Sequence, residues 1–276
     1  MSRFIDSHVH SDISHDGVSP MIEHMNEAHK QRLREITFTE HFDDYTGIDT
    51  DIKELDVSYY RKKYLDNKND NIVKTNFGIE IGLRPESEKK IKKLVKENDF
   101  DFIIGSSHIT CGKDMAYDKS FFEGLEPNQA ILNYLSEVIQ NIIIYKDDFD
   151  VYGHLDYVIR YVNRYYQMNM DKIDYDDFNN ILNHILLKLI RYNKGLEINT
   201  SGLRYGLKYP HPNIDILKKY KQYGGKIITL GSDAHKACDL AYGFDEALDI
   251  LEEVGFNEIA VYHNREPEFV KIKSMR

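Results

Sequence analysis

A chain of 276 residues is long enough to bury a large core, either as one α/β barrel or as two smaller domains. Hydrophobic residues make up 41% of it and charged residues 30%, which is typical of a globular protein and excludes extensive disorder. The formal net charge of −10 disfavours nucleic acid and anionic membrane surfaces as partners, because both are bound by basic faces.

Seven short runs with the composition of β-strands alternate with longer amphipathic stretches. In chain order the runs are SRFIDSHVH, EITFTEHF, TNFGIEIGL, FDFIIGSSHI, DVYGHLDYV, GLEINTSG and KIITLGSDAH. The stretches between them include residues 178–189, where apolar side chains form a helical stripe with i, i+3, i+4 spacing. Strands that alternate with helices pair in parallel, either in a closed barrel or in an open doubly wound sheet.

Each of the seven runs ends in polar side chains. In chain order these are His8 and His10, Glu40 and His41, Glu80, His108, His154, Glu197 and Asn199, and Asp233 and His235. The ends of the outer strands lie far apart in an open sheet, whereas a closed barrel brings all the carboxyl ends to one mouth. We therefore predict a closed α/β barrel with its functional site at the C-terminal ends of the strands.

These residue types predict a metal centre. Side chains alternate across a strand, so His8 and His10 share one face and can bind one ion, while Asp6 either orients an imidazole or caps a turn. The candidate ligands are His8, His10, Asp16, His41, Glu80, His108, His154, Asp233 and His235. Nine ligands are too many for one ion and suit two or three divalent ions, with a carboxylate such as Glu80 bridging. Mixed imidazole and carboxylate donors favour Zn²⁺ most, then Fe²⁺ or Mn²⁺, over Ca²⁺ and Mg²⁺.

Six motifs in this chain resemble those of the polymerase and histidinol phosphatase (PHP) family of metal-dependent phosphoesterases. They are DSHVHSDISHDG, TEHF, GIEIG, GSSHI, GHLDYV and GSDAH, in the order of the family from residue 6 to residue 235. The segments GHLDYVIRY, EINTSGLR and YPHP are further similar to the histidinol-phosphatase branch. The resemblance covers essentially the whole chain. It implies a distorted (β/α)7 barrel that forms a single domain over residues 1–276.

The resemblance also implies a division of the ligands among three ions. The first ion would be held by His8, His10, Glu80 and Asp233. The second would share Glu80 and add His108 and His154. The third would be held by Asp16, His41 and His235. Many members of the family carry histidine where this chain has Asp16, so the neighbouring His15 is the alternative ligand, and we favour Asp16.

The activity implied is hydrolysis of L-histidinol phosphate to L-histidinol and inorganic phosphate, a step of histidine biosynthesis. Three divalent ions outweigh three carboxylates and create a positive pocket for a phosphate dianion. A metal-bridging hydroxide would attack phosphorus, and Asp16, His235 or a metal-bound water would protonate the leaving alcohol. Arg160 and Arg204 are expected on loops at the barrel mouth, where a guanidinium group matches phosphate oxygens.

Other functions fit part of the pattern. A nucleotide phosphatase, a phosphotyrosine phosphatase or an exonuclease could share the fold, but an exonuclease predicts a basic groove that this composition disfavours. An amidohydrolase also begins with an H-x-H strand, but would normally carry a lysine at a mid-barrel strand end, where this chain has Glu80. A non-catalytic, metal-stabilised binding module predicts missing ligands, and all nine are present. The pattern carries no information on oligomeric state.

Polar residues outside the metal motifs are expected to be structural. Glu197 and Asn199 are expected to satisfy backbone groups, and His184 lies off its helix stripe and is expected to be exposed. Residues 110–128 and 160–175 form long segments rich in tyrosine and phenylalanine, which is typical of lids over a site. The histidines without an identifiable partner are His24, His29, His211 and His263.

Cysteine content and the lack of apolar segments indicate a soluble protein of the reducing cytoplasm. Cys111 and Cys238 are the only cysteines and cannot build a disulfide framework. We expect them to pack in the interior rather than act as nucleophiles, because no activating base pairs with them. The chain contains no run of about 18 apolar residues and no basic-then-apolar leader at its start, so we expect neither a membrane span nor processing.

Overall fold

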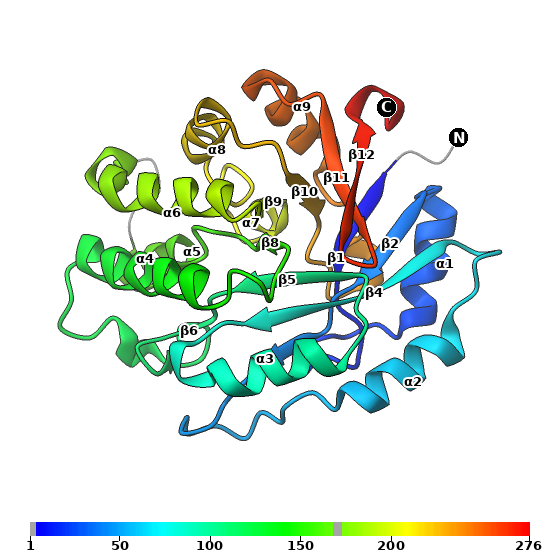
Figure 1. The fold of residues 1–276 in the computed structure, drawn as a ribbon, viewed down its shortest axis with the longest axis horizontal. Helices are drawn as coiled ribbons and strands as arrows, with labels where there is room; N and C mark the ends of the chain where they lie inside the picture. The colour runs from blue at the N-terminus through cyan, green and yellow to red at the C-terminus, as the bar shows by residue number, and fades with distance from the viewer. Residues whose placement is uncertain (1–3, 168–172) are drawn as a thin grey trace.

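The computed structural model describes residues 4–167 and 173–276, and at its centre parallel strands form a barrel surrounded by helices (Figure 1). The strands follow one another in the order β1-β2-β4-β5-β8-β9-β10. Their bounds are β1 (Ile5–Val9), β2 (Glu35–Phe38), β4 (Lys74–Gly82), β5 (Phe102–Ser106), β8 (Val151–Tyr152), β9 (Gly195–Asn199) and β10 (Ile228–Gly231). All neighbouring pairs are parallel. Each of the seven strand-like runs therefore contains one barrel strand, as predicted.

The first and last strands approach each other and nearly close the barrel. Just beyond their ends, the amide of Asp233 donates to the carbonyl of His8 at 2.9 Å. The amide of His10 donates to the carbonyl of Ala234 at the same distance, and Val9 forms a parallel bridge with Ala234. The predicted distorted (β/α)7 barrel is confirmed, and the residues that complete its closure belong to the motifs of the expected metal centre.

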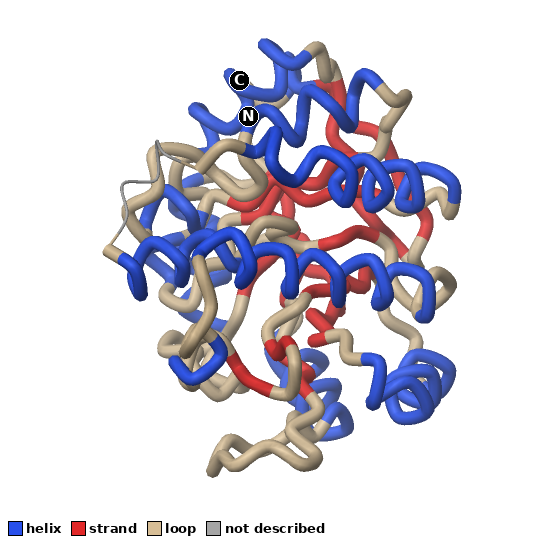
Figure 2. The backbone as a smooth tube through the Cα atoms, turned by 90° about the vertical axis from the view of Figure 1, so that its left-hand side faces the viewer, coloured by secondary structure: helices blue, strands red, loops and turns tan. Residues whose placement is uncertain are grey.

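Helices follow the strands and cover the outside of the barrel (Figure 2). The α-helices are α1 (Met21–Gln31), α2 (Val57–Asn67), α3 (Glu88–Glu97), α4 (Pro127–Ile144), α5 (Val158–Tyr166), α6 (Asn179–Arg191), α7 (Ser201–Arg204), α8 (Ile214–Gln222) and α9 (Phe244–Val254). The helical stripe expected over residues 178–189 is the buried face of α6. In the part of the chain that the structure describes, no helix combines the length and the apolar character that crossing a membrane requires.

The segments expected to be lids contain more regular structure than expected. Residues 110–128 include a short hairpin of β6 (Ile109–Thr110) and β7 (Lys113–Asp114), followed by the 3₁₀ helix η2 (Lys119–Phe121). The expectation of a loop over 160–175 is wrong up to Tyr166, because apolar side chains of α5 pack into the core and hold that stretch helical. Residues 168–172 of this segment lie outside the described residues. The remaining 3₁₀ helices are η1 (Pro85–Ser87), η4 (Tyr175–Phe178), η5 (Ala237–Asp239) and η6 (Ile272–Ser274).

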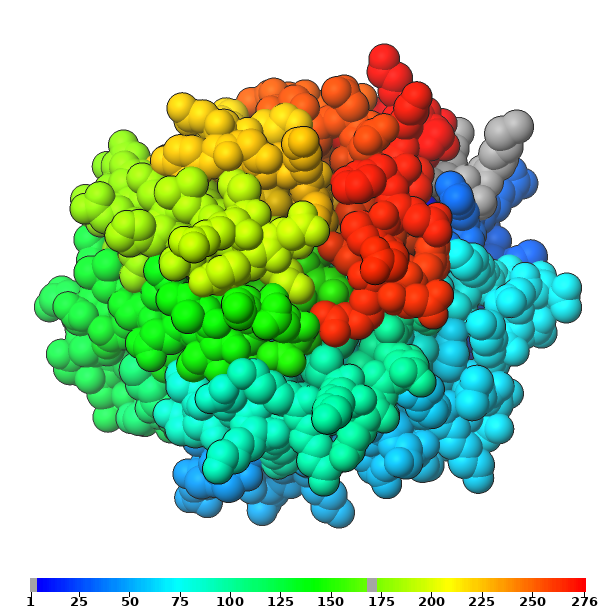
Figure 3. Space-filling model, viewed as in Figure 1, coloured from blue at the N-terminus to red at the C-terminus, as the bar shows by residue number. Residues whose placement is uncertain are grey.

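A hairpin near the C-terminus closes the amino-terminal end of the barrel, and the sequence pattern did not reveal it. Strand β11 (Glu258–His263) pairs antiparallel with β12 (Glu266–Lys271). The side chains that pack together beneath it are Phe102, Ile104, Val151, Ile227, Ala260 and Tyr262. Tyr262 stacks on Phe102 with 5.0 Å between ring centroids. In the space-filling view this hairpin, in red, lies against segments from both halves of the chain (Figure 3).

Candidate metal centre

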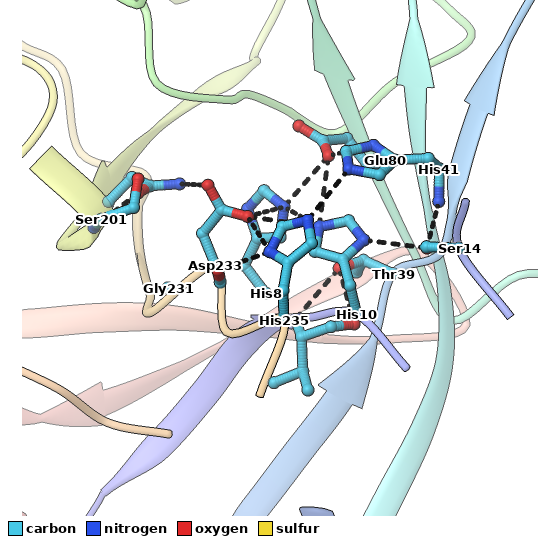
Figure 4. A network of polar contacts seen from close by, with 12 residues as sticks. His8, His10, Ser14, Thr39, His41, Glu80, Ser201, Gly231, Asp233 and His235 are labelled. Atoms are coloured by element: carbon cyan, nitrogen blue, oxygen red, sulfur yellow. Dashed lines mark hydrogen bonds and ion pairs between the residues drawn. The ribbon is translucent and has the colours of Figure 1, made fainter. Parts of the chain in front are cut away.

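The nine predicted ligands converge at the carboxyl ends of the barrel strands, and Figure 4 shows part of this cluster. Strand β1 carries His8, and His10 follows directly after its end. The short strand β3 (His41–Asp43) continues the line of β2, and its His41 is the register partner of Glu80 in β4. Asp16 lies in the turn between β1 and α1, and the other candidate ligands follow the ends of β5, β8 and β10. The polar ends of the sequence runs therefore meet at one mouth, as predicted.

The first ligand group surrounds one oxygen of Glu80. Glu80 Oε2 lies 3.2 Å from His8 Nε2 and 3.4 Å from His10 Nε2. Asp233 Oδ1 lies 3.7 Å and 3.3 Å from the same two nitrogens. All four side chains are buried. Two imidazole nitrogens and two carboxylate oxygens at this spacing form a donor set that suits one divalent cation.

The second group surrounds the other oxygen of Glu80. Glu80 Oε1 lies 2.9 Å from His154 Nε2 and 3.3 Å from His108 Nε2. The two nitrogens are 3.5 Å apart. On the other side, Oε2 also lies 3.0 Å from His41 Nδ1. Because its two oxygens face different sets of imidazoles, Glu80 has the geometry of a bridging carboxylate.

The third group is the most exposed. The Nε2 atoms of His41 and His235 lie 3.3 Å apart. The oxygens of Asp16 lie 3.2 Å from the nitrogen of His235 and 3.6 Å from that of His41. His15 instead directs its Nε2 toward the hydroxyl of Tyr117, at 3.3 Å. The geometry favours Asp16 over His15 as the third carboxylate of the cluster.

Two ligands of the cluster occupy an uncommon backbone conformation. His154 and Asp233 have φ angles of 21° and 55°, which residues other than glycine rarely adopt. Such residues gather at functional sites, where the surrounding structure holds a side chain in a required direction. At Gly231, by contrast, no side chain fits, because an added Cβ would collide with Glu197 Oε1 and with His8 Cβ. The glycine of the GSDAH motif therefore leaves room for a contact between those two residues.

The ligand groups do not satisfy one another without a cation. Glu80 Oε2 is buried and accepts no hydrogen bond from any residue that the structure describes. The Nε2 atoms of His8 and His10 face each other at 2.9 Å, and only one of the two can donate a proton to the other. An unsatisfied buried acceptor costs free energy, and a cation bound between these atoms would remove that cost. The residues present therefore fit metal ions.

Charges within the cluster shift the pKa values of its members. Burial alone would raise the pKa of Glu80, but the neighbouring His8 and His108 hold it well below its ordinary value. Burial alone would also raise the pKa of Asp233, but His8 outweighs this effect and holds that pKa well below its usual range. Burial and neighbouring imidazoles lower the pKa of His10 to about 4. Ionised carboxylates and a neutral His10 at pH 7 are forms that bind metal ions. Nearby carboxylates, Glu197 for His8 and Asp43 for His108, outweigh burial and raise the pKa of these two imidazoles, which must lose a proton when a metal ion binds.

Two carboxylates behind the ligands orient imidazole rings, and sequence reasoning missed this role for both. Glu197 Oε1 lies 2.5 Å from His8 Nδ1, and Asp43 Oδ1 lies 2.9 Å from His108 Nδ1. Each carboxylate accepts a hydrogen bond from the Nδ1–H group of the imidazole and so leaves Nε2 free to bind a metal. We expected Glu197 to satisfy backbone groups, and it does accept from the amide of His154 at 2.9 Å. The sequence did carry one signal for this role. Alternate residues of β9 face the barrel interior, and Glu197 lies on that face.

Asn199 satisfies a backbone group, as expected, and also hydrogen-bonds to a neighbouring carboxylate. Its Oδ1 accepts from the amide of Ser201 at 2.9 Å, which satisfies a backbone donor at the start of α7. Its Nδ2 donates to Glu197 Oε2 at 3.1 Å. Asn199 therefore supports the carboxylate that orients His8.

Two expectations about other residues are wrong. The carboxylate of Asp6 orients no imidazole, because it accepts from the backbone amides of Ser232 at 2.9 Å and Ala241 at 3.0 Å. It thereby ties the segment after β10 to β1. Cys111 and Cys238 are exposed rather than packed, since Cys111 lies in a left-handed turn and Cys238 in η5 on the surface.

Both predicted arginines lie at the barrel mouth, but on short helices rather than loops. Arg160 belongs to α5, and its guanidinium carbon lies 3.4 Å from the ring centroid of Tyr205. Arg204 ends α7 and donates to the carbonyls of Ser232 at 2.6 Å and Asp233 at 2.7 Å. In this structure Arg204 therefore holds the segment that carries a candidate ligand, whereas Arg160 lines the cavity, together with Arg164 of the same helix.

A cavity of about 440 Å³ opens beside the third ligand group. Its lining includes Asp16, His41, His108 and Arg160. Aromatic rings form much of the rest, among them Tyr157 and Tyr161. The volume lies within the range of small-molecule sites, and one cavity brings candidate metal ligands and a cationic side chain together.

The remaining histidines are structural or exposed. His184 is exposed, as expected. His211 is buried, with its Nδ1 2.5 Å from Asp156 Oδ1. His263 contacts Glu35 at 2.7 Å at the opposite end of the barrel. These partners lie more than fifty positions away along the chain, and no local pattern could reveal them.

Comparison with known proteins identifies the family. The family model described as the PHP domain matches residues 6–201, and the chain belongs to this family. The predicted resemblance is therefore confirmed. The histidinol-phosphatase of Lactococcus lactis subsp. lactis (strain IL1403) is 32% identical to this chain over 264 residues, covering 94% of each protein. A probable histidinol-phosphatase of Thermotoga maritima is 28% identical and covers 93% of this chain and 95% of its own.

Solved structures agree with this assignment. The histidinol phosphate phosphatase of Lactococcus lactis subsp. lactis Il1403, in complex with Zn, L-histidinol and phosphate, matches this structure with a TM-score of 0.82. The two chains are 28% identical, and the match covers 96% of this chain and 99% of that one. A putative histidinol phosphatase from Listeria monocytogenes matches with a TM-score of 0.77 at 19% identity, over 88% of this chain and 99% of its own, and supports the fold alone.

Proposed function

We propose that this protein is a metal-dependent phosphomonoesterase that hydrolyses L-histidinol phosphate to L-histidinol and inorganic phosphate. The observation that carries the proposal is the position of Glu80, whose Oε1 faces His108 and His154 while its Oε2 faces His8, His10 and His41. The cavity beside this cluster contains Arg160, a suitable partner for a phosphate group. The similarity to the Lactococcus lactis enzyme along nearly the whole chain supports L-histidinol phosphate as the substrate, and we propose that residues 1–276 act as one domain.

We further propose that the centre holds two or three divalent cations, with Zn²⁺ favoured by the mixed donors. The proposed first set is His8, His10, Glu80 and Asp233. The second is Glu80, His108 and His154, and the third is Asp16, His41 and His235. When bound, such cations neutralise charge on the phosphoryl oxygens and lower the pKa of a water molecule that attacks phosphorus.

The protein's own residues bind the substrate and fix the geometry. Glu197 and Asp43 hold His8 and His108 with Nε2 directed into the cluster. The guanidinium group of Arg160 is placed to pair with phosphate oxygens, and the ring of Tyr205 beneath it restricts its orientation. Arg204 contributes indirectly, because its hydrogen bond to the carbonyl of Asp233 holds the segment that carries this proposed ligand.

The leaving alcohol departs beside the third ligand group. Asp16 and His235 are more exposed than the ligands around Glu80, and their facing atoms are 3.2 Å apart. Asp16 also lines the cavity. An alcohol is a poor leaving group and needs a proton as it departs. Burial raises the pKa of Asp16 but His41 holds it well below its usual range, so this proton would come from His235 when its Nε2 is not bound to a cation, or from a water held at the third set.

A phosphate-release panel on metal-reconstituted protein tests the proposal. It should compare L-histidinol phosphate with phosphotyrosine, nucleotides and single-stranded DNA, and we expect the highest kcat/KM for L-histidinol phosphate. Arg160→Ala should raise the KM for this substrate by about 10-fold or more, because a charged hydrogen-bonding partner of the phosphate is lost. Arg191→Ala, at the exposed end of α6, removes the same charge and should leave the KM unchanged. Preference for nucleotides or DNA would refute the proposed substrate, and an unchanged KM in Arg160→Ala would remove that residue from the site.

A further inference from the structure

A buried carboxylate lines the cavity without a cationic partner. Asp114 is only 5% exposed and shares the cavity wall with His108. Its Oδ1 accepts from the amide of Ala116 at 2.9 Å, and its Oδ2 accepts from the hydroxyl of Tyr45 at 3.2 Å. Within 4.0 Å of this carboxylate, the described residues provide no lysine, arginine or histidine nitrogen. Its two donors are neutral, so among the described residues no cationic group pairs with it directly, although His108 nearby lowers its pKa in part.

The other carboxylates of the cavity differ in this respect. Asp16 contacts the imidazole of His235, and Asp43 contacts that of His108. Burial raises the pKa of Asp114, and the negative charge of the neighbouring Asp43 raises it further. A buried carboxylate is costly unless it is paired with a positive charge. A cationic group of a ligand in the cavity would supply that charge.

Topology fixes Asp114 beside the metal centre. It is the register partner of Ile109 in the β6–β7 hairpin, directly after His108. The amide of Met115 also donates to the carbonyl of His108, at 3.3 Å. Arg160 lines the same cavity, with its guanidinium carbon 5.3 Å from the ring centroid of Tyr157. The carboxylate, the phosphate-binding arginine and the ligand cluster therefore open onto one cavity.

We propose that Asp114 binds the ammonium group of the substrate, so that the site selects phosphate monoesters that carry a protonated amine. This inference rests on the proposed function. In L-histidinol phosphate the amine is on the carbon next to the one that bears the phosphate ester. The phosphate group of the substrate would then lie at the cations and Arg160, and its ammonium group at Asp114.

The test measures how the amine contributes to catalysis with and without this carboxylate. L-histidinol phosphate is compared with its deamino analogue, in which hydrogen replaces the amine, on the metal-loaded protein and on Asp114→Asn. In the unaltered protein kcat/KM should favour the amine by about 10- to 100-fold, the range for a hydrogen bond to a charged group. Asp114→Asn should reduce this ratio to near 1, with kcat/KM for the deamino analogue changed by less than about 2-fold.

A matched variant and a second measurement separate the outcomes. Asp118→Asn removes the same charge from an exposed position of the same segment and should leave the ratio unchanged. On the unaltered protein, ethanolamine phosphate should inhibit about 10-fold more strongly than ethyl phosphate, for the same reason. A ratio that survives in Asp114→Asn, an equal loss for both substrates, or equal inhibition by the two esters would overturn the inference. Absence of phosphate release from L-histidinol phosphate by the unaltered protein would instead overturn the proposed function.

Discussion

The two ends of the barrel are built from the same seven strands but satisfy their buried groups in different ways. At the amino-terminal end the β11–β12 hairpin covers an apolar cluster. The charges there are paired within the protein, as in the contacts of Arg265 with Asp150 at 3.0 Å and 2.9 Å. At the carboxyl-terminal end, Glu80 Oε2 has no hydrogen-bond partner in the described chain. Protein groups pair the buried charges at the amino-terminal end, whereas bound ligands are needed to pair those at the carboxyl-terminal end, where barrel enzymes place their sites.

This difference explains how a stable fold can hold so many uncompensated polar groups. Gathering carboxylates and imidazoles in a buried cluster opposes folding, because their desolvation is costly. The apolar contacts of the barrel and of its hairpin offset that cost from outside the cluster. We therefore expect substitutions at the two ends to have separable consequences, one for binding and catalysis and the other for stability.

The largest expected effect comes from Glu80→Gln at the carboxyl-terminal end. One side chain serves two ligand groups, so its loss should reduce phosphate release by at least about 10³-fold, the scale of metal-ion catalysis. Bound metal, measured by elemental analysis, should fall as well, while the circular dichroism spectrum stays unchanged. Glu97→Gln, at the exposed end of α3, makes the same change away from the site and serves as the control. Full metal content and activity in Glu80→Gln would refute the bridging role.

At the amino-terminal end, Tyr262→Ala should lower stability without changing catalysis. The ring is 5% exposed and stacks on Phe102, so its removal leaves a cavity and should lower the free energy of unfolding by about 3–5 kcal/mol. Activity per folded molecule should not change. Urea denaturation provides the measurement, and Phe269→Ala provides the control, because Phe269 lies on the same hairpin but is 48% exposed. A loss of metal binding in Tyr262→Ala would show that the two ends are not independent.

The strands and the nine ligands could be predicted because their signals are local. A buried parallel strand has the sequence of a short apolar run. A metal ligand at the barrel mouth must be one of a few residue types and must lie at the end of such a run. The β11–β12 hairpin gave no such signal, because β12 is largely exposed and rich in charged residues. Its role depends on the packing of Tyr262 against the start of a strand more than one hundred and fifty positions earlier.

The supporting residues could not be predicted, because their roles depend on distances between remote positions. Glu197 and His8 are 189 positions apart, and only the closed barrel brings Oε1 to Nδ1. Asp114 belongs to a hairpin of two-residue strands that no periodicity marks. The placement of Arg204 against the Asp233 segment likewise requires the full geometry of the mouth. Local patterns therefore identified the nine residues that converge at the barrel mouth, and only the structure revealed which side chains orient them.

The smallest expected effect comes from Glu197→Gln, which keeps the size of the side chain but removes the charge that orients His8. Loss of such a supporting carboxylate should weaken metal affinity or activity by about 10- to 100-fold. Metal titration followed by phosphate-release assays measures both quantities.

Glu35→Gln provides the matched control, because Glu35 is also a buried carboxylate beside a histidine, His263, but lies at the amino-terminal end. It should lower the stability and leave the metal affinity unchanged. Equal weakening of metal binding by both variants would contradict the division between the ends, since Glu35 contacts Lys74, Asn76 and His263 and none of the nine ligands. A loss confined to Glu197→Gln would show that the orientation of His8 sets the metal affinity, because the two variants remove the same charge from opposite ends of one barrel.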